Sequence, residues 1–267
     1  MSAKNNLGHS ILPAATGAPP AALPDHNSLK IVFPPDSRVR VTPTTAFPWN
    51  TIGQLIMKFP NGKTYGGTGT LIDEWHVLTA AHNLYGNDKG GLAVDVTFIP
   101  AFDAGTMPYG SAKAARLFVT DDYTHLSPPD PEETPVLDPN DVTQYTEDYA
   151  VIRLKTPFNL PYLTMAAPFD EDIQGTDARI TGYPGDKTFG QMWTAHGPLG
   201  APDDEFLFYK IDTFKGESGS AVTVVGEGSP YPVIWGVHVA GSAALGTNWA
   251  VRLTEDRIDQ INRWRNS

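Results

Sequence analysis

The segment Gly66–Ile72 (GGTGTLI) is followed, after Asp73 and Glu74, by the segment Trp75–His82 (WHVLTAAH). Each segment is of strand length and rich in apolar or β-branched residues, and the acidic pair between them is typical of a turn. We therefore predict two consecutive strands. His82 lies just beyond the end of the second strand.

The same pattern of short apolar stretches separated by turn residues continues from residue 31 onward. Leu55–Met57, for example, is followed by Asn61 and Gly62, a dipeptide that favours the tight turn of a β-hairpin. Helical patterns are scarce before the C-terminus, and the Pro- and Asp-rich stretch 120–147 is interpreted as one surface loop. The sequence thus predicts an all-β protein.

The chain has 267 residues, enough for two β-barrels followed by a terminal helix. We place the barrels at residues 31–148 and 149–252 and the helix at residues 253–267, where Thr254 can act as the N-terminal cap. Residues 1–30 are rich in Ala and Pro and show no strand or helix period, so we expect a flexible leader.

The acidic composition narrows the choice of partners. The formal net charge is −11, which disfavours nucleic acid and anionic membranes, and no apolar run reaches the roughly 18 residues that span a bilayer. We expect a soluble protein that acts on proteins or peptides.

Cysteine is absent, which excludes disulfides, thiolate metal sites and cysteine nucleophiles. Four aspartates of the long loop have no regular spacing, so we interpret them as solvated charges and assign neither a metal nor another cofactor. They are Asp121, Asp122, Asp138 and Asp141.

Three residues together have the chemistry of nucleophilic catalysis. Asp148 precedes an apolar strand, where it could be buried against the imidazole of His82, and Ser218 lies between Gly216 and Gly219 in the segment GESGS. A serine hydroxyl becomes a good nucleophile only when a neutral imidazole accepts its proton, and a carboxylate must orient that imidazole.

The segments LTAAH, DYAVI and GESGS, which contain His82, Asp148 and Ser218, together resemble the trypsin-like serine proteases. Within that class the chain is most similar to the glutamyl endopeptidases. Arg38–Pro48 resembles the start of their mature chains, and Thr181–Lys187 resembles one of their loops. The order His, Asp, Ser also matches the chymotrypsin arrangement, whereas subtilisin-like and α/β-hydrolase enzymes order these groups differently.

This resemblance implies a chymotrypsin-like double β-barrel that cleaves after Glu, and less readily after Asp. It implies that the backbone amides of Gly216 and Ser218 form the oxyanion hole and that Thr213 and His238 line the substrate pocket. It also implies a secreted, extracellular zymogen that works as a monomer. Its active form would begin at Ile31, whose new amine would fold back to the pocket.

Two features differ from the resembled family. Glu217 stands where trypsin-like enzymes usually have Asp and glutamyl endopeptidases often have Asn, and the 120–147 loop is longer than expected. If the new amine paired with Glu217 instead, it would order the oxyanion loop.

Two alternatives remain open from the sequence. One is a non-catalytic binding module that keeps the protease fold, against which the complete set of three catalytic residue types argues. The other is a protease of different specificity. For that case Asp212 is the nearby acidic residue that could serve a Lys- or Arg-binding pocket.

Overall fold

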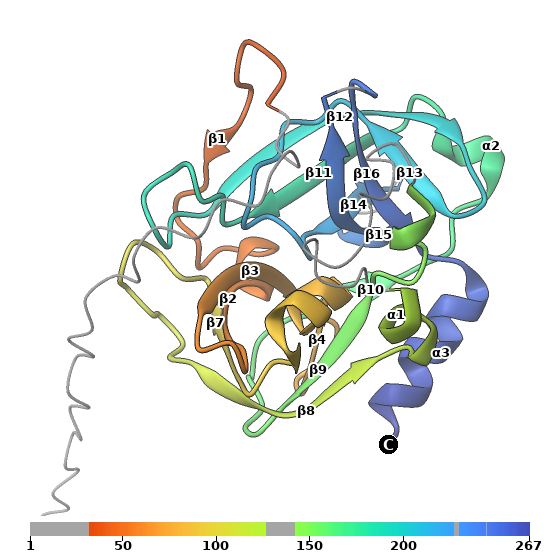
Figure 1. Ribbon diagram of the computed structural model, residues 1–267. Coiled ribbons are helices and arrows are strands. Elements are labelled where there is room, and N and C mark those ends of the chain that lie inside the picture. The colour runs from red at the N-terminus through yellow and green to blue at the C-terminus, as the bar shows by residue number, and fades with distance from the viewer. Residues whose placement is uncertain (1–31, 127–141, 227–229, 244) are drawn as a thin grey trace, which may run out of the picture.

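The computed structural model describes residues 32–126, 142–226, 230–243 and 245–267. Two β-structures contain nearly all of the described strands, and Figure 1 shows one of them below the other. The leader expected at residues 1–30 lies outside the described residues.

The first β-structure is a closed barrel of six strands joined in the order β2-β3-β4-β9-β8-β7. Their bounds are β2 (Ile52–Lys58), β3 (Thr64–Leu71), β4 (His76–Thr79), β7 (Asp95–Pro100), β8 (Ala112–Val119) and β9 (Ala150–Leu154). A separate two-stranded ribbon consists of β5 (Tyr85–Gly86) and β6 (Gly91–Leu92). Strands β2 and β3 form the expected hairpin, and Gly62 in its loop has a φ of 79°, which favours glycine.

The second β-structure is an eight-stranded sheet. Its strands are β1 (Val39–Arg40), β10 (Thr164–Met165), β11 (Asp177–Gly182), β12 (Trp193–Pro202), β13 (Phe206–Tyr209), β14 (Ala221–Val225), β15 (Pro232–Ser242) and β16 (Thr247–Arg252). The order β12-β11-β14-β15-β16-β13 returns to β12 through a further β12–β13 pairing, so six of the strands form a ring. Strand β1 pairs with β12 at the edge, which places a segment from the N-terminal part of the chain on the second sheet.

The first barrel extends past the boundary that we expected after Asp148. Strand β9 follows that boundary, yet it pairs with β4 and β8 and completes the first barrel. Ile152 packs into the core of this barrel, whereas Val151 on the opposite face packs into the core between the barrels. A strand buried on both faces is apolar throughout, so its sequence does not reveal which barrel it joins.

Three α-helices and four 3₁₀ turns accompany the strands in the described part of the chain. They are α1 (Asp121–Leu126), α2 (Asp170–Ile173), α3 (Glu255–Arg265), η1 (Trp49–Thr51), η2 (Ala81–Asn83), η3 (Asn87–Lys89) and η4 (Val142–Tyr145). Helix α1 and turn η4 lie at the two described ends of the stretch that we interpreted as a loop. Helix α1 begins after Thr120 because the Thr120 hydroxyl accepts a hydrogen bond from the Tyr123 amide at 3.0 Å, as a helix cap does.

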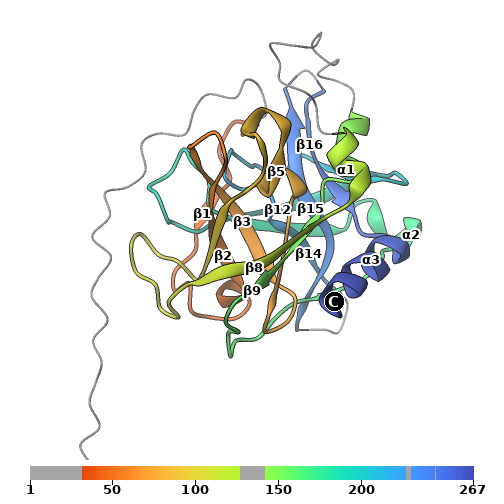
Figure 2. The same cartoon turned by 60° about the horizontal axis from the view of Figure 1, so that its bottom comes forward.

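The expected C-terminal helix is confirmed, and Thr254 caps it by accepting a hydrogen bond from the Arg257 amide. Trp264 on this helix stacks on Phe118 of β8, with ring centroids 6.1 Å apart, so the helix returns to the first barrel (Figure 2). No helix within the described ranges has the length and apolar character needed to cross a membrane.

Candidate active site

His82 and Asp148 are brought together by the pairing of β4 with β9. The register pairs Thr79 with Ala150, so the end of one strand lies beside the start of the other. His82 Nδ1 lies 2.7 Å from Asp148 Oδ2, and the His82 amide donates to Asp148 Oδ1 at 2.9 Å. The carboxylate is buried, whereas 27% of the imidazole remains exposed. Asp148 therefore fixes both the ring and the backbone of a histidine that a substrate can still reach.

Ser218 lies on a loop of the second β-structure that is anchored to the first barrel. Its carbonyl accepts hydrogen bonds from the Thr68 amide at 3.0 Å and from Asn83 Nδ2 at 2.8 Å. Asn83 follows His82, so this contact places Ser218 next to the histidine turn. The site thus lies where the two barrels meet.

Two glycines allow the Ser218 loop to turn as it does. Gly216 and Gly219 have φ values of 99° and 86°. A Cβ at Gly216 would lie 2.4 Å from the Tyr183 carbonyl oxygen, and a Cβ at Gly219 would lie 2.2 Å from Thr79 Oγ1. Only glycine fits these positions without moving the neighbouring residues. The amides of Gly216 and Ser218 donate no hydrogen bond to the described part of the chain.

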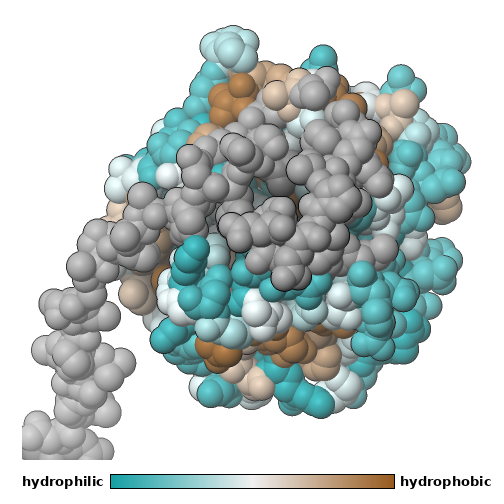
Figure 3. Space-filling view, viewed as in Figure 1, coloured by the Kyte–Doolittle hydropathy of each residue, from teal (hydrophilic) through white to brown (hydrophobic). Residues whose placement is uncertain are grey.

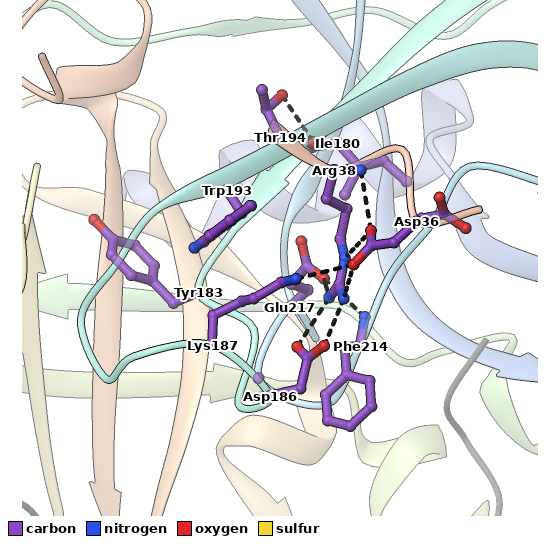
Figure 4. Close-up of polar contacts among 12 residues, drawn as sticks. Asp36, Arg38, Ile180, Tyr183, Asp186, Lys187, Trp193, Thr194, Phe214 and Glu217 are labelled. Atoms are coloured by element: carbon purple, nitrogen blue, oxygen red, sulfur yellow. Dashed lines mark hydrogen bonds and ion pairs between the residues drawn. The ribbon is translucent and has the colours of Figure 1, made fainter. Parts of the chain in front are cut away.

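Glu217 is buried between the two candidate oxyanion residues. Its Oε2 accepts a hydrogen bond from the Phe214 amide at 2.7 Å and lies 3.6 Å from Arg38 Nη1 (Figure 4). Burial raises the pKa of Glu217 to about 8, although the charge of Arg38 acts in the opposite direction. In the uncut chain the cation beside Glu217 is the side chain of Arg38, whereas Ile31, whose amine was the alternative partner, lies outside the described residues.

His238 of β15 lies directly beside the Ser218 loop. Its carbonyl accepts from the Gly219 amide at 2.8 Å, and its amide donates to the Ser220 carbonyl at 2.8 Å. His238 Nδ1 lies 2.7 Å from the Tyr209 hydroxyl. Burial lowers the pKa of His238 to about 3, and the charge of His82 acts in the same direction, so its imidazole is neutral near pH 7.

Thr213 and Asp212 lie together on the buried segment before the Ser218 loop. Asp212 accepts hydrogen bonds from the Phe33 amide at 2.5 Å, the Ser37 amide at 2.7 Å and the Ser37 hydroxyl at 2.6 Å. The N-terminal segment is therefore fixed beside a residue that we expected in the substrate pocket. Ile31 lies outside the described residues.

Four residues near the site were not singled out by the sequence. Thr68 Oγ1 donates to the Gly216 carbonyl at 2.8 Å, and Lys89 Nζ donates to the His82 carbonyl at 2.8 Å. Asn83 and Arg38 make the contacts described above. Thr68 and Arg38 belong to segments already quoted, and Asn83 directly follows one, but only the fold shows which atoms they contact. Among the described residues, no three His, Cys, Asp or Glu side chains gather as a metal site would require.

Comparisons with known proteins show which family the chain resembles. Residues 67–229 match the family described as the trypsin-like peptidase domain. A glutamyl endopeptidase of Bacillus licheniformis is 30% identical over 251 residues, which cover 90% of this chain and 71% of that protein. An extracellular metalloprotease of Bacillus subtilis is 30% identical over 234 residues, which cover 86% of this chain and 68% of that protein.

Solved structures show the same architecture. A Glu endopeptidase structure superposes with a TM-score of 0.73 and 26% identity, covering 89% of this chain and all of that chain. The protease Anisep of Arthrobacter nicotinovorans gives a TM-score of 0.58 at 18% identity, covering 80% of this chain and 93% of that chain. The second likeness concerns the fold alone.

The raised pKa of Glu217 predicts a pH-dependent contribution to stability. Folding favours the protonated carboxyl, so this contribution is complete below about pH 4.5 and is lost as the pH rises through about 8. Relative to Glu217→Gln, the free energy of unfolding of the wild type should fall over this window by up to about 1.4 kcal/mol per pH unit. Urea unfolding at pH 5, 6.5, 8 and 9 measures it. Glu171→Gln, at an exposed position of α2, is the control; a difference between wild type and Glu217→Gln that stays constant with pH contradicts the prediction.

Proposed function

The chain belongs to the trypsin-like peptidase family, and we propose that this serine endopeptidase cleaves after Glu, and less readily after Asp, through an acyl-enzyme on Ser218. The chymotrypsin-like fold and the serine endopeptidase class expected from the sequence are confirmed by the likeness to glutamyl endopeptidases. The observation that carries the proposal is the contact of buried Asp148 with His82 beside the Ser218 loop.

In the proposed reaction, Ser218 Oγ attacks the carbonyl carbon of the scissile bond while His82 takes up the hydroxyl proton. His82 then gives this proton to the leaving amine, and the acyl group stays on Ser218. A water molecule, deprotonated by His82, releases the acid product. Asp148 accepts a hydrogen bond from His82 Nδ1–H, which leaves Nε2 free to face the serine, and its charge stabilises the imidazolium that forms.

The amides of Gly216 and Ser218 are proposed to bind the oxyanion of the tetrahedral intermediate. Gly216 presents its amide through a backbone conformation that requires glycine, and Thr68 holds its carbonyl on the other side. Loss of one such donor typically costs roughly 3–4 kcal/mol of transition-state stabilisation. The rigidity of this loop is therefore part of the catalytic machinery.

Thr213 and His238 are proposed to read the substrate glutamate. Burial raises the pKa of Tyr209 well above its ordinary value, so its phenol keeps its proton and can donate to His238 Nδ1. The imidazole then carries its own proton on Nε2. A hydroxyl and a neutral imidazole offer hydrogen bonds to a carboxylate but no positive charge, and a buried carboxylate without a cation is costly.

The missing positive charge is proposed to come from the N-terminus after cleavage before Ile31. Phe33 is fixed on Asp212, next to Thr213, and two residues of extended chain span at most about 7 Å. A free amine at Ile31 therefore lies within reach of the pocket. Since an enzyme specific for Glu would not cut after Lys30, a separate Lys-specific protease would make the cut.

Trypsin-like specificity is the second candidate function, and Asp212 is the residue that it would need. Both carboxylate oxygens of Asp212 already accept hydrogen bonds from Phe33 and Ser37, so this aspartate is not placed to bind a substrate cation. The likeness to glutamyl endopeptidases argues against the other alternative, the non-catalytic binding module. Labelling of Ser218 by a fluorophosphonate probe distinguishes an enzyme from such a binding module.

We further propose an extracellular monomer that acts on protein or peptide substrates and not on nucleic acid. One of the two relatives is named as an extracellular protease, and the net charge of −11 repels polyanions. On the face in Figure 3, hydrophobic residues form small separate groups among hydrophilic ones, as in most monomers.

Ser218→Ala should reduce kcat by at least about a thousandfold, because it removes the nucleophile while leaving the other binding groups in place. Thermal unfolding should be nearly unchanged. The matched control is Ser220→Ala, which removes a buried hydroxyl from the same loop that has no hydrogen-bond partner among the described residues. Activity of Ser218→Ala within tenfold of wild type would show that another residue is the nucleophile.

His238→Ala should lower kcat/KM for Glu substrates at least about tenfold more than for substrates with an uncharged residue before the scissile bond. The reason is that the substrate carboxylate loses a hydrogen-bond donor. His238→Gln, which keeps an N–H donor in a buried position, is the second variant, and thermal unfolding reports on folding. Equal losses on both substrates would mean that His238 supports only the fold.

A chain that begins at Ile31 should cleave Glu substrates at least about tenfold faster than the intact full-length chain, because the free amine pairs with the substrate carboxylate. The two proteins are compared by kcat/KM after N-terminal sequencing. A trimmed chain whose N-terminus is acetylated is the control and should lose the gain. Equal rates for the intact and trimmed chains would contradict activation by the amine.

A further inference from the structure

Arg38 carries a charge into the interior beside the Ser218 loop. Only 1% of its side chain is exposed. A guanidinium stays charged in proteins, and an unpaired buried charge is very costly, so such a side chain needs several partners. Figure 4 shows Arg38 reaching from the N-terminal segment toward Glu217.

Three carboxyl groups surround the guanidinium. Asp36 accepts from Arg38 Nε and Nη2, both at 2.9 Å, and Asp186 accepts from Nη1 at 3.0 Å and Nη2 at 2.5 Å. Glu217 Oε2 lies 3.6 Å from Nη1. Lys187 Nζ adds a second cation 2.9 Å from Asp36, so Arg38 is the cation that faces Glu217 directly. The two aspartates bind the guanidinium together and so fix its orientation.

Glu217 in turn closes the loop that holds the candidate oxyanion amides. Its side chain accepts from the Phe214 amide, its own amide donates to the Phe214 carbonyl at 3.0 Å, and its carbonyl accepts from the Ser220 amide at 2.9 Å. Residues 214–220 thus fold around Glu217, with Gly216 and Ser218 on either side of it. The Glu217 side chain is therefore bonded into the same turn that carries both amides.

We propose that Arg38 is a positioning residue for catalysis, which orders the 214–220 loop through Glu217 and makes it depend on docking of the N-terminal segment. The proposal rests on the proposed function of Gly216 and Ser218. It separates two roles within one segment: Arg38 supports catalysis on every substrate, whereas the amine at Ile31 concerns only substrates with a carboxylate. The cation is already in place in the uncut chain, so ordering of the loop requires no cleavage.

The test uses the full-length chain with Arg38→Gln, Arg38→Lys and the double variant Arg38→Gln/Glu217→Gln. The control is Arg40→Gln, which removes a half-exposed cation two residues away that pairs with Asp103 and does not contact Glu217. Three quantities are measured: deuterium exchange of peptides covering residues 212–220, the rate of labelling by a fluorophosphonate, and kcat and KM on a peptide substrate.

Arg38→Gln should speed exchange in residues 212–220 and slow labelling at least about tenfold, with the loss in kcat and not in KM, since the oxyanion donors act on the transition state. Arg38→Lys should lie in between. The double variant should recover at least about threefold of the labelling rate, because it also removes the buried Glu217 carboxyl that Arg38→Gln leaves without its neighbouring cation. Arg40→Gln should stay within about twofold of wild type.

Unchanged exchange in residues 212–220 in Arg38→Gln would overturn the proposal, and so would a double variant no better than Arg38→Gln alone. The latter outcome would mean that Arg38 acts only through Asp36 and Asp186. Deuterium exchange gives its answer even if the wild type cleaves no Glu substrate, so failure of the proposed function and failure of this proposal are distinguishable.

Discussion

The hydrogen bonds that Thr68 and Asn83 make to the Ser218 carbonyl tie the second β-structure to the first barrel at the point where chemistry is proposed. His82 and Asp148 come from the first barrel, whereas Ser218 comes from the second, so the relative position of the barrels sets the geometry of all three. Strand β9 strengthens this tie because its two faces enter the two cores. A site assembled at such a junction needs no long flexible connections. Because the two cores are closely packed, they hold the site residues in place, and catalysis tolerates only small errors in their positions.

His238 and Glu217, the two buried ionisable residues on either side of Ser218, differ in how their charge is avoided or compensated. On one side His238 is kept neutral, because burial lowers its pKa, and Tyr209 occupies one of its ring nitrogens. On the other side Glu217 has Arg38 as a nearby cation, although burial still raises its pKa. If His238 binds the substrate carboxylate as proposed, no ion pair of His238 has to break first. The Arg38 guanidinium is already bound by Asp36 and Asp186, which fits the ordering role proposed for it and not a role in substrate binding.

The parts that could be predicted from the sequence are local in the chain. The strand pair ending at His82, the hairpin at Gly62 and the cap at Thr254 follow from period, turn residues and capping chemistry within a few positions. The limits of the first barrel could not be predicted, because β9 is apolar on both faces and joins strands from far earlier in the chain. The contact between Arg38 and Glu217 could not be predicted either, since a pair separated by most of the chain leaves no periodic pattern.

The N-terminal segment links specificity with catalysis through two neighbouring anchors. Asp212 binds Phe33 and Ser37, and Arg38, the next residue, faces Glu217, so docking of one anchor brings the other into place. Asp212 and Glu217 are five residues apart on the same segment, and Thr213, which we propose lines the substrate pocket, lies between them. The cost of ordering residues 33–38 is thus offset by hydrogen bonds and ion pairs that also shape the substrate pocket and the oxyanion loop. A chain that lost residues 33–38 would lose both anchors together. Cleavage before Ile31 leaves both anchors intact and adds only an amine. Activation by cleavage and order by Arg38 are therefore compatible, because they act on different sides of Ser218.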